Sequence, residues 1–266
     1  MSTLVVIPAR FASQRYPGKP LVGLRGATGE VRSLIERTWR VAQGMQAEAL
    51  VVIATDDGRI EAAAKAFGAE VVMTPASCAN GTERCAAAHA ALGNAFEIVV
   101  NLQGDAPLTP PWFLDALIAE IRGDPTVEMA TPVLRCTGRM LESLRDDRRA
   151  GRVGGTTAVF DRHRHALYFS KEVVPFVATS YAPDAQTPVF HHVGAYAYRA
   201  GALMAYPDWP EGALERLEGL EQLRFLEAGA RVRCVEVDAK GRAFWELNNP
   251  EDVPKIEAMM KDLNLP

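Results

Sequence analysis

Short apolar runs alternate with amphipathic stretches along the first half of the chain. The runs are rich in valine, isoleucine and leucine, as is typical of strands buried on both faces, and they cover residues 4–7, 49–54, 70–73 and 97–102. The stretches between them have helical spacing and cover residues 31–43, 58–67, 82–92 and 111–121. This alternation predicts βαβ units that form a largely parallel sheet with helices on both faces.

The second half of the chain has a different pattern. A strand predicted at 127–134 leads into a polar segment rich in Arg and Asp. More loosely spaced strands follow at 154–160, 166–169 and 189–198, with a proline-containing loop at 175–188. A helix at 218–227, a strand at 232–237 and a helix at 250–263 complete the chain. We therefore predict one α/β domain over 1–266, with a mixed, mostly parallel sheet and a small β-rich excursion at about 152–199.

Composition narrows the class of protein. The 266 residues fit one large domain, since single cores grow to roughly 250–300 residues. With 29 basic and 33 acidic residues the net charge is −4, so we expect neither nucleic acid nor a membrane surface as partner. Four scattered cysteines without a CxxC pair, and the lack of an apolar stretch of about 18 residues, predict a cytoplasmic protein with reduced thiols.

The basic charge is unevenly distributed. Residues 1–29 hold four basic residues and no acidic one, so the rest of the chain carries −8. Arg10, Arg15 and Lys19 follow the first predicted strand, and ligands of open α/β sheets bind at the carboxyl ends of strands. The loop therefore suits a polyphosphate, although an exposed basic loop without a ligand is an equal alternative. The loop contains neither the GxGxxG nor the GxxxxGK[ST] pattern, which disfavours a dehydrogenase or a P-loop enzyme.

A second candidate site follows the strand at 97–102. The sequence there ends in Gln103-Gly104-Asp105. A carboxylate at the end of a strand, next to a glycine that permits close approach, is a natural ligand for Mg²⁺ that carries substrate phosphates. The alternative is an aspartate that only stabilises a turn, which is common.

Together these two segments carry a resemblance to a known family. The segments IPARFASQRYPGKPL (7–21) and VVNLQGDAPL (99–108) resemble those of the sugar nucleotidyltransferases, and specifically the 3-deoxy-manno-octulosonate (Kdo) cytidylyltransferases, also called CMP-Kdo synthetases. Six further segments agree in order, namely IATDD at 53–57, GTERCA at 81–86, ALYFSK at 166–171, HHVGAYAYR at 191–199, LEQLRFLEAG at 220–229 and NPEDV at 249–253. The resemblance implies the nucleotide-diphospho-sugar transferase fold.

The resemblance also implies an activity and a set of site residues. The family condenses CTP with an acidic eight-carbon keto sugar to give the CMP-sugar and pyrophosphate, with Mg²⁺ as cofactor, in a homodimer joined through the β-rich excursion. The catalytic positions match Arg10, Lys19 and Asp105. The nucleotide-binding positions match Pro8, Ala9, Arg10, Ser13, Arg15, Lys19 and Gln103. The sugar-binding positions match Lys171, His192, Tyr196, Glu221 and Gln222, and Asp105 is the implied metal ligand.

The sugar-site residues each have a plainer interpretation. His192, inside an apolar run, could be a hydrogen-bonded core histidine, and Tyr196 alternates with small residues as a sheet-surface aromatic would. Glu221 lies on a predicted helix, where it could pair with Arg224 three residues later. The family match, rather than the local chemistry, favours the functional interpretation.

The chain departs from the family pattern at the second metal ligand. The usual aspartate of a Gly-x-Asp-Thr-Pro-Glu-Asp stretch is replaced by Asn248, a neutral donor, and Glu246 two residues earlier could take its place. Ala106, Lys171 and Cys78 also differ from the usual residues. These changes leave open three alternatives: Kdo as the acceptor, a modified Kdo such as the 8-amino sugar or another acidic sugar, and a nucleotide-binding protein that has lost catalysis.

Overall fold

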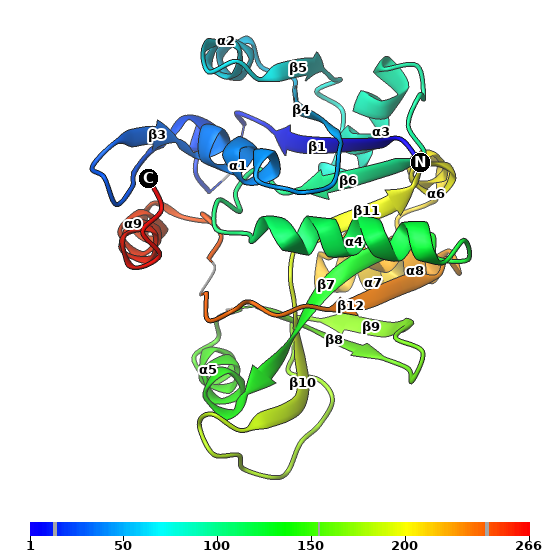
Figure 1. Ribbon diagram of the computed structural model, residues 1–266. Coiled ribbons are helices and arrows are strands. Elements are labelled where there is room, and N and C mark those ends of the chain that lie inside the picture. The colour runs from blue at the N-terminus through cyan, green and yellow to red at the C-terminus, as the bar shows by residue number, and fades with distance from the viewer. Residues whose placement is uncertain (13–14, 154, 243–244) are drawn as a thin grey trace.

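The computed structural model describes residues 1–12, 15–153, 155–242 and 245–266. Within them a ten-stranded sheet runs in the order β5-β4-β1-β6-β11-β7-β10-β8-β9, with β12 beside β7 (Figure 1). Its strands are β1 (Thr3–Ala9), β4 (Leu50–Thr55), β5 (Glu70–Met73), β6 (Ile98–Leu102), β7 (Met129–Thr137), β8 (Thr156–Phe160), β9 (Ala166–Ser170), β10 (Gln186–His192), β11 (Ala195–Arg199) and β12 (Val232–Glu236).

The sheet is mixed and most of its strands share one direction, as predicted. The pairs β4–β5, β1–β4, β1–β6 and β7–β12 are parallel. Three strands, β11, β10 and β9, run against the others, so apart from β7–β12 the pairs beyond β6 are antiparallel. The predicted β-rich excursion supplies β8 to β11, which continue the main sheet beyond β6.

Helices cover both faces of the sheet. They are α1 (Leu34–Gln43), α2 (Gly58–Ala66), α3 (Gly81–Ala91), α4 (Pro111–Gly123), α5 (Gly138–Arg149), α6 (Ala200–Ala205), α7 (Ala213–Glu218), α8 (Leu223–Glu227) and α9 (Val253–Asp262). Short 3₁₀ turns cover Lys19–Leu21, Tyr206–Asp208 and Pro250–Asp252, and β2 (Gly23–Arg25) pairs with β3 (Val31–Ser33) in a separate hairpin. None of the described helices is both long enough and apolar enough to cross a bilayer.

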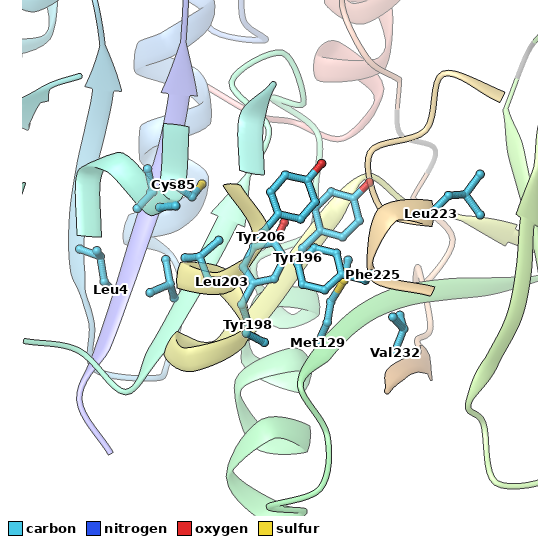
Figure 2. Packing of buried hydrophobic residues seen from close by; sticks show 14 of the residues in the cluster. Leu4, Cys85, Met129, Tyr196, Tyr198, Leu203, Tyr206, Leu223, Phe225 and Val232 are labelled. Carbon is cyan, nitrogen blue, oxygen red and sulfur yellow. The ribbon is translucent and has the colours of Figure 1, made fainter. Parts of the chain in front are cut away.

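Alternation along the strands separates two cores. Val5 and Ile7 of β1 face α1, α2 and α4, whereas Leu4 and Val6 face α3 and the helices after β11. On that second face the rings of Tyr196, Tyr198, Tyr206 and Phe225 gather in one cluster (Figure 2). This cluster joins the sheet to α8 and therefore fixes the segment that leads into α8.

Three predicted elements differ from the structure. Residues 31–33 form β3 before α1 begins, because Ser33 caps the helix by accepting a hydrogen bond from the backbone of Glu36 at 3.3 Å. The predicted strand 189–198 is two strands that are separated at Val193 and Gly194. The predicted helix 218–227 is broken, since Gly219 has a positive φ of 61° and ends α7.

Three of the described helices were not predicted. Helix α7 shares only Glu218 with the predicted helix 218–227. Helix α5 lies in the polar segment after β7, where many charged residues mask its short apolar stripe of Leu141 and Leu144. Helix α6 has only six residues, too few for a periodic pattern. Gly154, the first residue of one predicted strand, lies outside the described residues.

Candidate active site

The ends of β1 and β6 place the two sequence motifs side by side. The strands pair in parallel, so Pro8 and Ala9 at the end of β1 lie next to the chain that follows Leu102. A Cβ atom on Gly104 would stand 2.5 Å from the carbonyl oxygen of Pro8, a distance that no real side chain allows. Glycine is therefore required for the two chains to approach this closely.

The basic loop folds back onto the carboxylate of Asp105. Gly18, at φ 72°, donates its backbone N–H to the carbonyl of Phe11 at 3.0 Å and turns the chain into the 3₁₀ turn that begins at Lys19. Nζ of Lys19 then lies 2.6 Å from Oδ2 of Asp105. A cation from one motif and a carboxylate from the other thus share one half-buried position.

The segment after residue 244 completes this side of the site. Leu247 donates its backbone N–H to the carbonyl of Asp105 at 2.9 Å, and Nη2 of Arg15 donates to Oδ1 of Asn248 at 3.0 Å. Burial and the negative charge of Asp105 raise the pKa of Glu246 to about 7. Glu246 and Asn248 therefore both lie close to the two motifs, as the sequence predicted, and they can act together rather than as alternatives.

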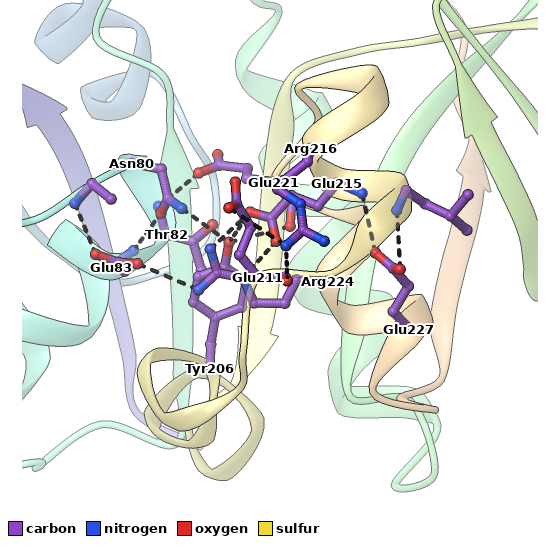
Figure 3. Close-up of polar contacts among 12 residues, drawn as sticks. Asn80, Thr82, Glu83, Tyr206, Glu211, Glu215, Arg216, Glu221, Arg224 and Glu227 are labelled. Atoms are coloured by element: carbon purple, nitrogen blue, oxygen red, sulfur yellow. Dashed lines mark hydrogen bonds and ion pairs between the residues drawn. The ribbon is translucent and has the colours of Figure 1, made fainter.

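On the other side of Asp105, Gln103 connects the site to the segment between α7 and α8. Its Nε2 donates to Oε1 of Glu221 at 3.1 Å. Oε2 of Glu221 accepts the backbone N–H of Thr82 at 3.1 Å, and Figure 3 shows these two residues. Burial raises the pKa of Glu221. Glu221 lies in the turn between the two helices, so its predicted helical position is wrong. Arg224, its partner in the plainer interpretation, pairs with Glu215 and Glu83 instead.

Tyr196 and Gln222 lie together in the interior next to Glu221. The hydroxyl of Tyr196 donates to Oε1 of Gln222 at 3.2 Å. Nε2 of Gln222 is buried and has no hydrogen-bond partner among the described residues. An unpaired buried amide is costly, so a ligand oxygen at this position would satisfy it.

His192 is held by two threonines beneath this group. Its Nε2 lies 2.9 Å from Oγ1 of Thr131, and its Nδ1 lies 3.1 Å from Oγ1 of Thr156. Burial, together with His191 beside it, lowers its pKa to about 3, so the ring is neutral. It packs 5.8 Å from the ring of Tyr196, centroid to centroid, which orients the tyrosine; direct contact between His192 and a sugar stays a prediction.

Lys171 approaches the same segment from β9. Its Nζ lies 3.1 Å from the position that a Cβ atom on Gly219 would take, and its backbone N–H donates to Glu218 at 2.8 Å. Of the remaining predicted residues, Arg10 is exposed just after β1, and Ser13 lies outside the described residues. The described site residues otherwise form two neighbouring groups: Arg15, Lys19, Asp105, Glu246 and Asn248, and then Gln103, Glu221, Gln222, Tyr196 and His192.

Some residues that hold these groups in place were not predicted from the sequence. Thr82 contributes the backbone N–H that binds Glu221. A Cβ atom on Gly81 would lie 3.2 Å from Nε2 of Gln103, so a side chain there would displace Gln103 slightly. Glu218, in turn, accepts hydrogen bonds from Ser170 at 2.7 Å and from the backbone of Lys171. The Gly-Thr pair at the start of a predicted helix was the available signal for the first two.

Comparison with known proteins shows which family the chain resembles. The cytidylyltransferase family profile matches residues 4–233. The 3-deoxy-manno-octulosonate cytidylyltransferase of Maricaulis maris is 42% identical over 98% of this chain and 97% of its own, and that of Chlamydia pneumoniae is 38% identical over 95% and 91%. A solved CMP:2-keto-3-deoxy-manno-octonic acid synthetase, complexed with CTP, superposes with a TM-score of 0.82 at 32% identity and covers 99% of this chain and 100% of its own.

The α/β sheet with its basic loop and strand-end carboxylate is thus that of a nucleotidyltransferase. Within that class the chain belongs to the 3-deoxy-manno-octulosonate cytidylyltransferase family. The resemblance drawn from the sequence motifs is confirmed over nearly the whole chain.

Proposed function

We propose that this protein condenses CTP with 3-deoxy-manno-octulosonate to give CMP-Kdo and pyrophosphate. The observation that carries the proposal is the contact between Lys19 and Asp105 at 2.6 Å, directly beside the polar group that begins at Gln103. A phosphate-binding half and a sugar-binding half thereby meet at one strand end. The full-length similarity to Kdo cytidylyltransferases supports the same assignment.

The chemistry asks for positioning and charge more than for a covalent intermediate. In the proposed reaction the anomeric hydroxyl of the sugar attacks the α-phosphorus of CTP in line, the P–O bond to the β-phosphate breaks, and pyrophosphate leaves. Arg10, Arg15 and Lys19 neutralise the charge that develops on the leaving group. The unpaired Nε2 of Gln222 and the hydroxyl of Tyr196 hold oxygens of the sugar.

We also propose Mg²⁺ as the cofactor. Oδ2 of Asp105 accepts a hydrogen bond from Lys19, and Oδ1 of Asn248 accepts one from Arg15. Each of these oxygens therefore already faces a positively charged group. Glu246 provides a second carboxylate, whose pKa is raised by burial and by the negative charge of Asp105 nearby. This set of hard oxygen donors fits Mg²⁺, which would neutralise phosphate charge and orient the triphosphate when bound.

A panel of acceptors tests the proposed function. Purified protein is given CTP, Mg²⁺ and one acidic sugar at a time, and pyrophosphate release is followed. We expect release with Kdo. Pyrophosphate release only with 8-amino-Kdo or with another acidic sugar would mean that this sugar, and not Kdo, is the acceptor. CTP binding without pyrophosphate release in the presence of any of the sugars would mean a nucleotide-binding protein that has lost catalysis.

A homodimer is part of the proposal. Three large apolar side chains are strongly exposed: Leu167 on the edge strand β9 is 64% exposed, Leu217 on α7 83% and Phe176 in the loop after β9 90%. Exposed apolar side chains of this size favour association with a second copy. Light scattering should give twice the 28.9 kDa of one chain, and Leu217→Glu should yield a monomer; a monomeric parent protein would contradict the dimer.

The place of the reaction in the cell follows from the substrates. CTP is a cytoplasmic metabolite, and buried thiols such as Cys85 and Cys234 are unpaired. We therefore place the enzyme in the cytoplasm, where its product would serve lipopolysaccharide synthesis.

A further inference from the structure

A buried ion-pair network lies behind the sugar-binding half of the site. Arg224 of α8 donates from Nε and Nη2 to the two oxygens of Glu215 in α7, at 2.7 and 2.8 Å (Figure 3). Both side chains are almost fully buried. A bidentate pair of this kind fixes distance and orientation together, so it joins α7 to α8 rigidly.

The same guanidinium reaches a third helix. Its Nη1 lies 3.4 Å from Oε1 of Glu83 in the first turn of α3, and its plane stacks on Tyr206 at 4.2 Å from the ring centroid. Glu83 in turn accepts the backbone N–H of Ala79 at 2.8 Å. Arg224 therefore lies at the point where α3, α7 and α8 meet.

The segment that Arg224 holds carries two predicted sugar ligands. Glu221 and Gln222 immediately precede α8, and the backbone N–H of Arg224 donates to the carbonyl of Glu221 at 3.3 Å. Tyr206 donates from its hydroxyl to the same carbonyl at 3.3 Å. The backbone of this turn is thus held by Arg224 and Tyr206. The side chains of Glu221 and Gln222 form hydrogen bonds with Gln103 and Tyr196 respectively.

We propose that Arg224 is a positioning residue that sets the affinity for the acidic sugar by fixing Glu221 and Gln222 against α3, without touching substrate. This inference rests on the proposed function, because it assigns Glu221 and Gln222 to the acceptor. The geometry supports an indirect role, since the guanidinium is buried and its donors are directed at Glu215 and Glu83. CTP, by contrast, is assigned chiefly to the loop after β1, and Gln103 is the predicted nucleotide ligand that contacts Glu221 among the described residues.

The test compares kinetic constants for the two substrates separately in the full-length enzyme. Arg224→Met removes the hydrogen bonds to Glu215 and Glu83, whereas Arg224→Lys keeps the positive charge but not the bidentate geometry. Arg216→Met is the matched control, because Arg216 lies on α7 in an exposed pair with Glu211. We expect Arg224→Met to lower kcat/KM for the sugar about 100-fold and Arg224→Lys about 10-fold, with KM for CTP changed less than about twofold. Arg216→Met should behave as the parent.

Coupling to Glu215 gives a second readout. If the pair acts as a unit, Arg224→Lys combined with Glu215→Gln should cost no more than the larger single change. Equal increases in KM for both substrates, or a folded Arg224→Lys enzyme with parental constants, would overturn the inference. If Arg224→Met does not fold, the lysine variant decides. A parent enzyme without turnover of Kdo would instead overturn the proposed function, and this inference would fall with it.

Discussion

At the scale of single residues, we propose the most direct role for the Asp105 carboxylate. It accepts a hydrogen bond from the Lys19 ammonium at 2.6 Å and is one quarter exposed. In the proposed reaction a metal ion would take the place of this ammonium beside Asp105. Lys19 would then be available for the phosphates.

Asp105→Asn should therefore abolish most of the activity while leaving the fold intact. Loss of one charged group that stabilises the transferring phosphate typically costs about 10²- to 10³-fold in kcat. The measurement is pyrophosphate release at saturating CTP and sugar, with circular dichroism as the check on folding. Asp184→Asn, at an exposed aspartate in the loop before β10, is the control. Near-parental turnover of Asp105→Asn would contradict the metal assignment.

Asn248→Asp tests the departure from the family pattern. An aspartate would add a third carboxylate beside Asp105 and Glu246, so we expect the Mg²⁺ concentration for half-maximal activity to fall by about tenfold. A titration of activity with Mg²⁺ measures it. Asn249→Asp is the control, because Asn249 is exposed and caps the 3₁₀ turn, a role that aspartate also performs. If both variants titrate as the parent does, Asn248 does not reach the metal.

At the scale of elements, the parallel contact of β1 with β6 brings the site together. The close approach of Gly104 to Pro8 joins the strand ends, and the hydroxyl of Thr38 in α1 donates to the carbonyl of Gly104 at 3.2 Å. The loop after β1 and the loop after β6 are therefore one structural unit. A change in their spacing should alter both stability and chemistry.

Gly104→Ala should separate these strand ends. The added methyl group would lie 2.5 Å from a backbone oxygen that cannot move freely, so we expect a loss of about 1–3 kcal/mol in the free energy of unfolding. Activity should fall more than tenfold. Gly123→Ala in α4 is the control, since its methyl group meets nothing within 4 Å and should leave both unchanged. Chemical denaturation and pyrophosphate release measure the two effects. A parental Gly104→Ala enzyme would contradict the close contact.

Elements with regular periodicity could be predicted from the sequence, whereas breaks in them could not. The βαβ pattern gave β1, β4, β5 and β6 because parallel strands need continuous apolar runs. The break at Gly219 remained hidden, since an isolated glycine in a helical pattern is compatible with a continuous helix. The motifs identified Lys19 and Asp105, but Arg224 and Glu215 became visible only when tertiary packing brought three helices together.

At the scale of the whole molecule, acidification should destabilise the fold through two adjacent histidines. Burial lowers the pKa of His191 to about 4 and that of His192 to about 3, whereas both titrate near 6.5 when unfolded. Below pH 6.5 the unfolded chain therefore binds more protons than the folded one, and their contribution to stability decreases as the pH falls. Above pH 6.5 that contribution is complete.

His192→Gln removes one of these two titratable groups. The free energy of unfolding of the parent should therefore approach that of this variant by about 1.4 kcal/mol for each pH unit as the pH falls from 6.5 to 4.5. Urea unfolding at a series of pH values measures it, and Thr131→Ser, which keeps both the histidine and a hydroxyl, should retain the parental slope. A difference that does not change with pH would mean that His192 is not held neutral in the fold.

Phosphorus NMR can follow the proposed transfer of CMP from CTP to Kdo. The spectrum of protein, CTP, Mg²⁺ and Kdo should lose the three CTP resonances and gain those of pyrophosphate and of one phosphodiester, the CMP-sugar. Asp105→Asn should leave the CTP resonances in place. Unchanged CTP with the parent protein, or CMP in place of the phosphodiester, would contradict the account.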